Sequence, residues 1–257
     1  MTGLVLRSDR DGVAWLTLNR PEALNALSPA LFVELRAHLD SIGSNEDEIG
    51  CVVLQGSGRA FSAGNDIKAI QTGDRAPEPH FQAETIDNLE ALPQPVIAST
   101  HGPCYTGALE VALGCDLIVA GESSTFADTH GRWALTPTWG MSQRLPRRIG
   151  ALKAKQMMLT GTTVTADEAL GLGLVNVVVP DDQRVEKTTE LAATILVNSW
   201  HTLRADKRLV NEGQRYTLVD GLAYERRTSP GGGPDMAARL ASFRRGGRPN
   251  APANDNS

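Results

Sequence analysis

Aromatic residues make up only 5% of the 257-residue sequence, and cysteine occurs three times. Cys51, Cys104 and Cys115 form an odd set without a Cys-x-x-Cys spacing. This excludes a disulfide framework and a zinc knuckle. We expect reduced thiols in a cytoplasmic protein.

Long apolar runs are also missing. Every apolar stretch is broken by Gly, Pro, His or Asp well before the ~18 residues that a transmembrane helix needs. The first ten residues include Arg7, Asp9 and Arg10 rather than an apolar segment, so a secretory signal is not expected. We therefore predict neither membrane insertion nor secretion.

Neither sign of charge dominates the chain. Lys and Arg number 25 and Asp and Glu 30, which leaves a formal charge of −5. A mildly acidic protein is a poor partner for nucleic acid or an acidic membrane surface, and we expect it to bind neither. With 41% hydrophobic and 21% charged residues, the composition is that of a globular protein with one sizeable core plus an appendage, or with two small domains.

Several common catalytic motifs are absent. The sequence has no Gly-x-Ser-x-Gly and no Gly-Lys of a phosphate-binding loop, and its five histidines are too far apart to form a metal-binding helix pair. Gly56-Ser-Gly58 follows an apolar run, but Phe61 occupies the third glycine position of a dinucleotide fingerprint. No metal and no nicotinamide cofactor are expected.

Short apolar runs alternate with helical patterns along most of the chain. The runs predict strands at 12–19, 51–54, 95–99, 116–120 and 174–179, and the patterns predict helices at 28–40, 82–92, 107–114, 150–159 and 165–171. Ser28 followed by Pro29 is typical of a helix start, and Thr165 with Glu168 forms a capping-box sequence. The alternation predicts an α/β architecture.

The pattern changes near residue 183. From there to residue 227 it is helical almost throughout, and residues 246–257 are polar and rich in Gly, Pro and Asn. We predict a core at 1–182, a helical region at 183–245 and a disordered tail at 246–257.

Two of the predicted strands end in glycine-bearing turns. One turn carries Gly56, Gly58 and Gly64, and the other carries Gly102 and Gly107. Backbone N–H groups at such turns, and at the helix starts that follow them, can bind an anionic oxygen. Two converging N–H groups would form an oxyanion hole, although each glycine alone is also explained as a plain turn residue.

Glu110 stands out because it interrupts the apolar stretch from Ala108 to Leu113. It follows Gly107 by three residues, which would place its carboxylate on the same helix face as the Gly107 amide. Burial would raise its pKa toward the range that suits proton transfer. The residues alone leave an ordinary exposed helix face as the alternative.

Ordered blocks of sequence span nearly the whole chain: 18–27 (LNRPEALNAL), 59–68 (RAFSAGNDIK), 95–98 (PVIA), 107–110 (GALE), 115–116 (CD), Phe126, 145–146 (LP) and 170–175 (LGLGLV). In these blocks the sequence resembles the enoyl-CoA hydratase/isomerase, or crotonase, family. The resemblance implies a spiral of ββα units with a C-terminal helical trimerisation region, and a homotrimer or a hexamer built as a dimer of trimers. It also implies an acyl-CoA thioester substrate, so that coenzyme A is part of the substrate and no separate cofactor is expected.

The resemblance assigns roles to individual residues. The amides of Asn65 and Gly107 would bind the thioester oxygen. The residues implied along the coenzyme A path are Ala23 and Leu24 near the adenine, Arg59 and Lys68 near the phosphates, and Ala63, Asp66 and Ile67 between them. Phe243 is a candidate for an aromatic residue that closes the adenine pocket of a neighbouring subunit.

One feature of the family pattern is missing. Glu110 occupies the place of the first catalytic glutamate, but the place of the second falls on His130, with Asp128 two residues earlier. Trp133 and Trp139 stand where the family has smaller residues, and they either fill core or interface or shape the acyl pocket. A histidine titrates near neutral pH, so the acid/base role can pass to His130.

The resemblance therefore predicts an enoyl-CoA hydratase, with catalytic residues Glu110, His130, Asn65 and Gly107. The replacement at position 130 keeps other functions open. These are double-bond isomerisation, another lyase or hydrolase reaction of this fold, and binding of acyl-CoA without catalysis.

Overall fold

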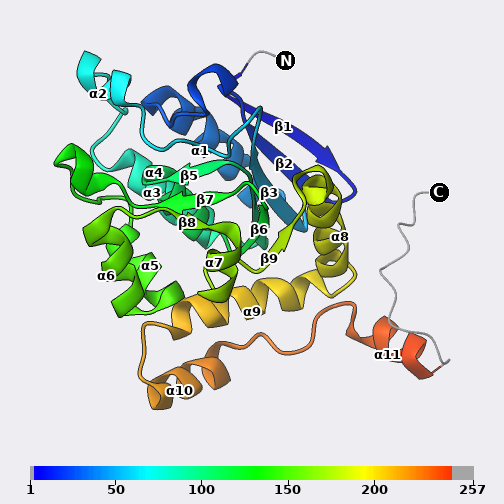
Figure 1. The fold of residues 1–257 in the computed structure, drawn as a ribbon. Coiled ribbons are helices and arrows are strands. Elements are labelled where there is room, and N and C mark those ends of the chain that lie inside the picture. The colour runs from blue at the N-terminus through cyan, green and yellow to red at the C-terminus, as the bar shows by residue number, and fades with distance from the viewer. Residues whose placement is uncertain (1–2, 245–257) are drawn as a thin grey trace.

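The computed structural model describes residues 3–244, and its centre is a six-stranded sheet (Figure 1). The strands follow the order β1-β2-β3-β4-β6-β9, with bounds Val5–Arg10, Val13–Leu18, Cys51–Gly56, Val96–Thr100, Leu117–Gly121 and Val177–Val179. All neighbours are parallel except β1 and β2. That pair is joined by Asp11 and Gly12, both with positive φ (51° and 75°), as a tight two-residue hairpin requires.

The predicted strands agree with this sheet except at two places. The run at 174–179 contributes only Val177–Val179, because Leu174 and Val175 belong to the turn that leads into the strand. Strand β1 was not predicted, since it lies at the sheet edge and its residues from Leu6 onward are only partly covered or exposed.

Both faces of the sheet are buried, which explains why its parallel strands are mostly apolar. On β2, Ala14 and Leu16 point into the main core, whereas Val13 and Trp15 point to the opposite face. The opposite face is covered by one helix, α8 (Arg184–Leu196), through residues such as Ala192. The helical region after residue 183 therefore begins with an element that completes the core.

A second, three-stranded sheet contains β5 (Pro103–Tyr105), β7 (Thr125–Ala127) and β8 (Val164–Thr165). A single bridge between Ser62 and Cys104 extends it by one position. Each turn of the chain thus leaves the large sheet, adds a short piece to the small sheet and continues into a helix. This winding is the predicted spiral of ββα units.

The remaining elements surround these two sheets (Figure 1). The short 3-10 helices are η1 (Pro21–Ala23), η2 (His130–Trp133) and η3 (Asp181–Gln183). The α-helices of the core are α1 (Pro29–Gly43), α2 (Ile67–Thr72), α3 (Phe81–Ala91), α4 (Gly107–Leu113), α5 (Met141–Ile149), α6 (Ala151–Thr160) and α7 (Ala166–Gly171). The predicted starts of α1 and α7 are confirmed, because Ser28 and Thr165 each accept a hydrogen bond from the first helical turn.

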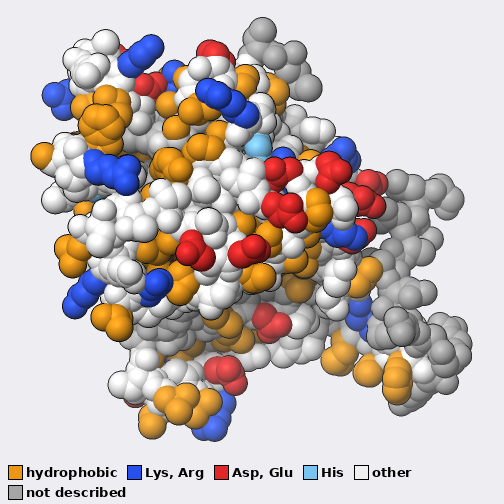
Figure 2. Space-filling model, viewed as in Figure 1, with side chains coloured by type: hydrophobic (Ala, Val, Ile, Leu, Met, Phe, Trp, Pro, Cys, Tyr) orange, Lys and Arg blue, Asp and Glu red, His pale blue; other side chains and the backbone are white. Residues whose placement is uncertain are grey.

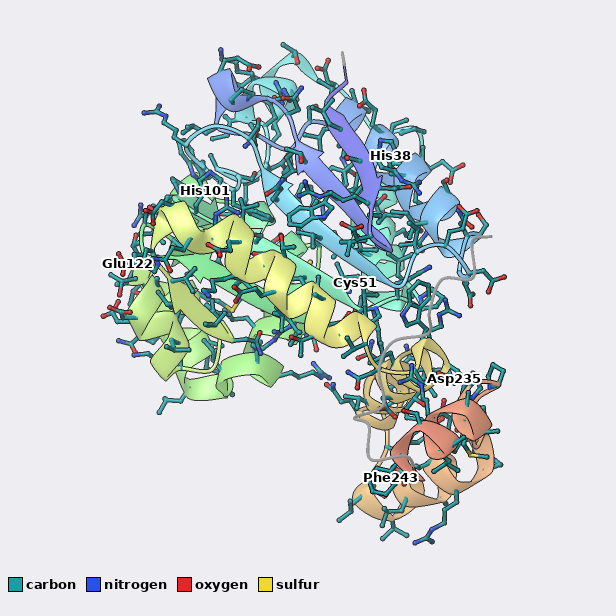
Figure 3. The ribbon with its side chains drawn as sticks, turned by 90° about the vertical axis from the view of Figure 1, so that its right-hand side faces the viewer. His38, Cys51, His101, Glu122, Asp235 and Phe243 are labelled. Carbon is teal, nitrogen blue, oxygen red and sulfur yellow. The ribbon has the colours of Figure 1, made fainter. Side chains whose placement is uncertain are left out.

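The C-terminal helices are α9 (Trp200–Gly213), α10 (Leu218–Thr228) and α11 (Met236–Arg244). Helix α9 runs along the core, whereas α10 and α11 lie farther from the sheets, and apolar side chains gather on α10 (Figures 1 and 2). Leu218 and Val219 are 78% and 76% exposed. Phe243 lies on α11, also exposed and apart from the strands (Figure 3). The domain boundary at 183 stays a prediction, and the tail at 246–257 lies outside the described residues.

Candidate active site

Two loops from distant parts of the sequence meet at the start of α4. Gly64 has a φ of 98°, and a Cβ built on it would lie 2.5 Å from the carbonyl oxygen of Tyr105. A Cβ on Gly107 would lie 3.3 Å from the amide nitrogen of Asn65. Only glycine permits this approach, and the approach brings the amides of Asn65 and Gly107 to the same place.

Both of these amides are free to bind a ligand. Within residues 3–244, neither the Asn65 nor the Gly107 N–H donates to a protein acceptor. The residue before Gly107, Thr106, has a φ of 53° and is held there by bonds to Ala127 and Thr129. Such conformations are costly for a β-branched residue and persist where the surroundings enforce them, as they do at many functional sites.

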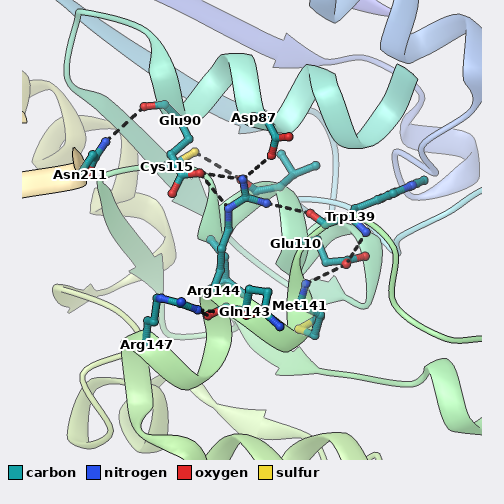
Figure 4. A network of polar contacts seen from close by, with 12 residues as sticks. Asp87, Glu90, Glu110, Cys115, Trp139, Met141, Gln143, Arg144, Arg147 and Asn211 are labelled. Atoms are coloured by element: carbon teal, nitrogen blue, oxygen red, sulfur yellow. Dashed lines mark hydrogen bonds and ion pairs between the residues drawn. The ribbon is translucent and has the colours of Figure 1, made fainter. Parts of the chain in front are cut away.

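Glu110 lies one turn into α4 and is 1% exposed. Its Oε1 accepts hydrogen bonds from the backbone N–H groups of Trp139 (3.0 Å) and Met141 (2.9 Å), as Figure 4 shows. Burial raises the pKa of Glu110 above its usual range, although these two N–H groups and the charge of His130 oppose the shift. The alternative of an ordinary exposed helix face is therefore wrong, and the expected burial of the carboxyl is confirmed.

His130 lies opposite Glu110, with its Nε2 3.8 Å from Oε2 of the glutamate. Its Nδ1 is 2.6 Å from Oδ1 of Asp128, which is 2% exposed. Burial opposes the charged imidazolium, but the hydrogen bond and charge of Asp128 and the charge of Glu110 together raise the pKa of His130. His130 thus faces Glu110 directly, and Asp128 lies behind it.

These groups line a cavity of about 330 Å³. Its walls combine Asn65, Glu110 and His130 with side chains from α2 and from the segment before α5, namely Ile70, Ala134, Leu135, Thr136, Thr138 and Trp139. The cavity brings together both predicted acid/base residues and the loop of one predicted oxyanion amide. It is large enough for a short acyl group rather than a whole cofactor.

The two tryptophans of this segment have different surroundings. Trp139 is 9% exposed, packs edge-on against Phe32 (ring centroids 5.0 Å apart) and lies against Gly107. Trp133 is 57% exposed and does not line the cavity. Of the two, only Trp139 shapes the space next to Glu110.

The residues implied along the coenzyme A path lie on two adjoining loops. The Ala63 N–H donates to the carbonyl oxygen of Leu24, so the segments that contain Ala23 and Asn65 run side by side. The side chains of Arg59, Ile67 and Lys68 are exposed.

Asp66 has a different environment from these neighbours. Its carboxylate caps α2 by accepting from the N–H groups of Lys68 and Ala69, and it pairs with Arg20 at 2.7 Å. Burial opposes the ionised form, but Arg20 and these N–H groups lower the pKa of Asp66 below its usual value. The Asp66 carboxylate is thus occupied by partners within the protein, and only the small exposed part of the residue can contact a ligand.

Two parts of the site were not found from the sequence. The donors to Glu110 are backbone groups of Trp139 and Met141, which leave no signature in residue type. Asn25 is fully buried, and its side chain donates to Ser57 and Ala60 and accepts from the Arg20 N–H. Asn25 has a positive φ (54°), as does Leu24 before it (49°). Because Asn tolerates this conformation in turns, its backbone conformation is the one feature that the sequence could have suggested.

Other chemistry is not apparent in residues 3–244. No group of three or more His, Cys, Asp or Glu side chains there is arranged to hold a metal ion. No helix in that range combines the length and apolarity required to cross a bilayer. Cys51, Cys104 and Cys115 are all buried and unpaired.

The fold and the site define a protein with a spiral ββα core, two free amides at a helix start and a buried carboxylate beside them. Residues 8–229 match the family model described as enoyl-CoA hydratase/isomerase. The chain therefore belongs to the enoyl-CoA hydratase/isomerase family, and the resemblance found in the sequence is confirmed.

Individual relatives agree with this membership. The chain is 34% identical over 221 residues to a protein of Arabidopsis thaliana named "Probable enoyl-CoA hydratase 1, peroxisomal", covering 86% of this chain and 83% of the relative. It is also 34% identical to the "Short-chain-enoyl-CoA hydratase" of Clostridium acetobutylicum, with 83% of each chain covered.

Solved structures confirm the predicted fold class. The crystal structure of an enoyl-CoA hydratase from Bacillus anthracis superposes with a TM-score of 0.90 at 33% identity, and the match covers 96% of this chain and 98% of that one. An enoyl-CoA hydratase subunit from Geobacillus kaustophilus superposes with a TM-score of 0.87 at 31% identity, covering 96% and 97% of the two chains.

Proposed function

We propose that this protein is an enoyl-CoA hydratase that adds water to the conjugated double bond of a 2-enoyl-CoA thioester. The observation that carries the proposal is the pair formed by Glu110 and His130, whose Oε2 and Nε2 lie 3.8 Å apart on one small cavity. Two titratable groups of different chemistry can remove a proton from water and supply one to carbon. A double-bond isomerisation needs only one such group, so the pair favours hydration.

The free amides of Asn65 and Gly107 supply the second requirement of this reaction. When water adds to the β-carbon, negative charge moves onto the thioester oxygen as an enolate. Two N–H donors on that oxygen stabilise the charge, and the loss of one such donor costs about 3 kcal/mol in the transition state. The close approach of the two loops at Gly64 and Gly107 supports this role.

Catalysis by Glu110 and His130 needs no redox step. The water oxygen bonds to the β-carbon, one hydrogen reaches the α-carbon, and the second hydrogen of water remains on the new hydroxyl group. The atoms of water and substrate are all retained in the product. We therefore propose that coenzyme A, as part of the substrate, is the only cofactor-like group involved and that no metal takes part.

The coenzyme A portion of the substrate is proposed to follow the two adjoining loops. Ala23 and Leu24 would contact the adenine end, and Ala63, Asp66 and Ile67 would line the path. The exposed cations Arg59 and Lys68 would approach the phosphates. The hydrogen bond that joins Leu24 to Ala63 supports one continuous surface for this path.

Assembly and compartment are part of the same proposal. The exposed Leu218 and Val219 on α10 support association of several copies through the C-terminal helices, as a homotrimer or as a hexamer made of two trimers. Three buried, unpaired thiols support a reducing, cytoplasmic environment. We propose no nucleic-acid and no membrane partner.

The test follows the loss of the conjugated thioester absorbance when the protein is mixed with crotonyl-CoA. Glu110→Gln keeps the shape and removes the base, so its kcat should fall at least about 100-fold. Glu186→Gln, at an exposed position of α8, is the matched control and should retain full activity. Equal rates for Glu110→Gln and the unchanged protein would refute the role of Glu110, and tight acyl-CoA binding without turnover would identify a non-catalytic binder instead.

A further inference from the structure

We propose that Asp128 is a positioning residue that holds His130 as an imidazolium with its Nε2–H directed to the cavity, which makes His130 the proton donor and Glu110 the base. This inference rests on the proposed hydration reaction and assigns a direction to its proton transfers. It concerns a residue that does not line the cavity and so touches no substrate.

The contacts of Asp128 determine the orientation of the imidazole ring. Oδ1 of Asp128 accepts from the backbone N–H of His130 at 3.0 Å and from Nδ1 of the same residue at 2.6 Å. A carboxylate can only accept at this distance, so Nδ1 carries a hydrogen in either charge state of the ring. Nε2 is therefore the atom left to exchange a proton with the cavity.

The backbone around Asp128 is held firmly. Asp128 directly follows β7, which is hydrogen-bonded to β5 on one side and β8 on the other. The next residue, Thr129, bonds through both its N–H and its hydroxyl group to the side chain of Thr106. The aspartate thus connects the ring of His130 to a rigid part of the small sheet and to the residue that precedes Gly107.

The charges around the ring favour its protonated form. Glu110 faces it from α4 and Asp128 from the end of β7. Apart from Glu110 and His130, no charged side chain of the described residues lines this cavity. Arg132 is nearby in sequence, but it donates to the carbonyl oxygen of Gly161. With a neutral ring, two buried carboxylates would lie together without a cation, which is costly in a buried site.

Glu110 is suited to the opposite role. Its Oε1 is already occupied by the N–H groups of Trp139 and Met141, which stabilise the ionised carboxylate. Its Oε2 faces His130 and remains available as an acceptor. Water held at Oε2 would lose a proton to Glu110 while its oxygen bonds to the β-carbon.

The proton balance closes within this pair. His130 gives its Nε2–H to the α-carbon as the enolate collapses, and Glu110 has gained one proton from water. The two atoms are 3.8 Å apart, about 1 Å more than a hydrogen bond between charged groups requires. A small movement, or one bridging water after product leaves, returns the proton from Glu110 to His130 and restores both groups.

Asp128→Asn tests this arrangement, because it keeps an acceptor for the Nδ1–H and removes the charge. With crotonyl-CoA, we expect kcat to fall about 100-fold and KM to change less than about 2-fold. The alkaline limb of the kcat profile should move to lower pH, since the ring loses its proton more easily. Asp116→Asn is the matched control, another largely buried aspartate that pairs with Lys207 at 2.7 Å, and it should leave the limb in place.

Nuclear magnetic resonance titration of the His130 ring in the ligand-free protein provides a readout independent of activity. We expect protonated Nε2 and Nδ1 at neutral pH, and a lower titration midpoint in Asp128→Asn. The inference would be overturned if the His130 ring of the unchanged protein were already neutral at a pH below the ordinary titration midpoint of histidine. It would also be overturned if Asp128→Asn were active and the alkaline limb of its kcat profile had not moved. Absence of hydration in the unchanged protein would instead refute the proposed function, and the titration would still decide the state of the ring.

Discussion

Trp139 contacts both halves of the site, because its backbone N–H donates to Oε1 of Glu110 at 3.0 Å while its ring lies against Gly107. The residue thus couples the orientation of the carboxylate to the position of an amide that we propose binds the thioester oxygen. Its ring is in turn supported by Phe32 in the main core. Small changes at either contact are therefore expected to affect catalysis.

The first prediction concerns Gly107→Ala. The added Cβ would lie 2.5 Å from Cζ3 of Trp139, so the ring or the loop must move. We expect kcat/KM for crotonyl-CoA to fall about 100-fold through the displaced amide, with a loss of about 1 to 3 kcal/mol in the free energy of unfolding. Gly171→Ala, where the space is open, serves as control and should change neither quantity by much. Retained activity in Gly107→Ala would contradict the role of this amide.

The second prediction concerns the stability cost of the buried Glu110 carboxylate. Its pKa in the folded protein is raised above the ordinary value of 4.5, so the unfolded chain releases this proton at lower pH than the folded one. The favourable contribution of the protonated group is complete below that ordinary value and is lost as the pH rises through the raised pKa.

Glu110→Gln removes this titration. Relative to the variant, the unchanged protein should lose unfolding free energy as the pH rises from below 4.5 through the raised pKa of Glu110. Urea denaturation of both proteins at several pH values measures the difference. A difference that does not vary with pH would show that Glu110 titrates normally in the folded state.

The third prediction concerns the attachment of α9 to the core. Nζ of Lys207 lies 2.7 Å from Oδ2 of Asp116 and donates to the carbonyl oxygen of Gln94, and its side chain is 7% exposed. Lys207→Ala leaves a largely buried carboxylate without its cation. We expect the free energy of unfolding, measured by urea denaturation, to fall by about 2 to 3 kcal/mol. The matched change Lys187→Ala breaks an exposed ion pair with Glu190 and should have no measurable effect.

The fourth prediction concerns Asn25, which joins the two loops of the proposed coenzyme A path. Its side chain donates to the carbonyl oxygens of Ser57 and Ala60 at 2.8 Å each. Asn25→Ala leaves these buried groups unpaired, so we expect the free energy of unfolding to fall by about 2 kcal/mol. We also expect KM for crotonyl-CoA to rise by a larger factor than kcat falls. Asn198→Ala, at an exposed position, should alter neither constant. A change confined to kcat would argue that these loops do not bind the coenzyme.

Much of the fold follows from local sequence. The apolar run of β3 and the Ser28-Pro29 start of α1 each depend on residues close in sequence, so periodicity and capping rules detect them. Helix α5 was missed because its pattern contains Pro146 and three arginines, yet Met141 and Leu145 bury one face against the core. Burial outweighed a weak local preference there.

The sequence by itself determined the elements of the candidate site: a glycine at each loop, a glutamate one turn after Gly107, and a histidine where the family has a second glutamate. Only the tertiary structure decided that His130 rather than Asp128 faces Glu110, and that backbone N–H groups of Trp139 and Met141 hold the carboxylate. Spacing along a helix or turn is set by local geometry, which residue types encode. Contacts across the spiral depend on how separate turns of the chain stack, and a backbone donor can belong to any residue that the stacking brings there.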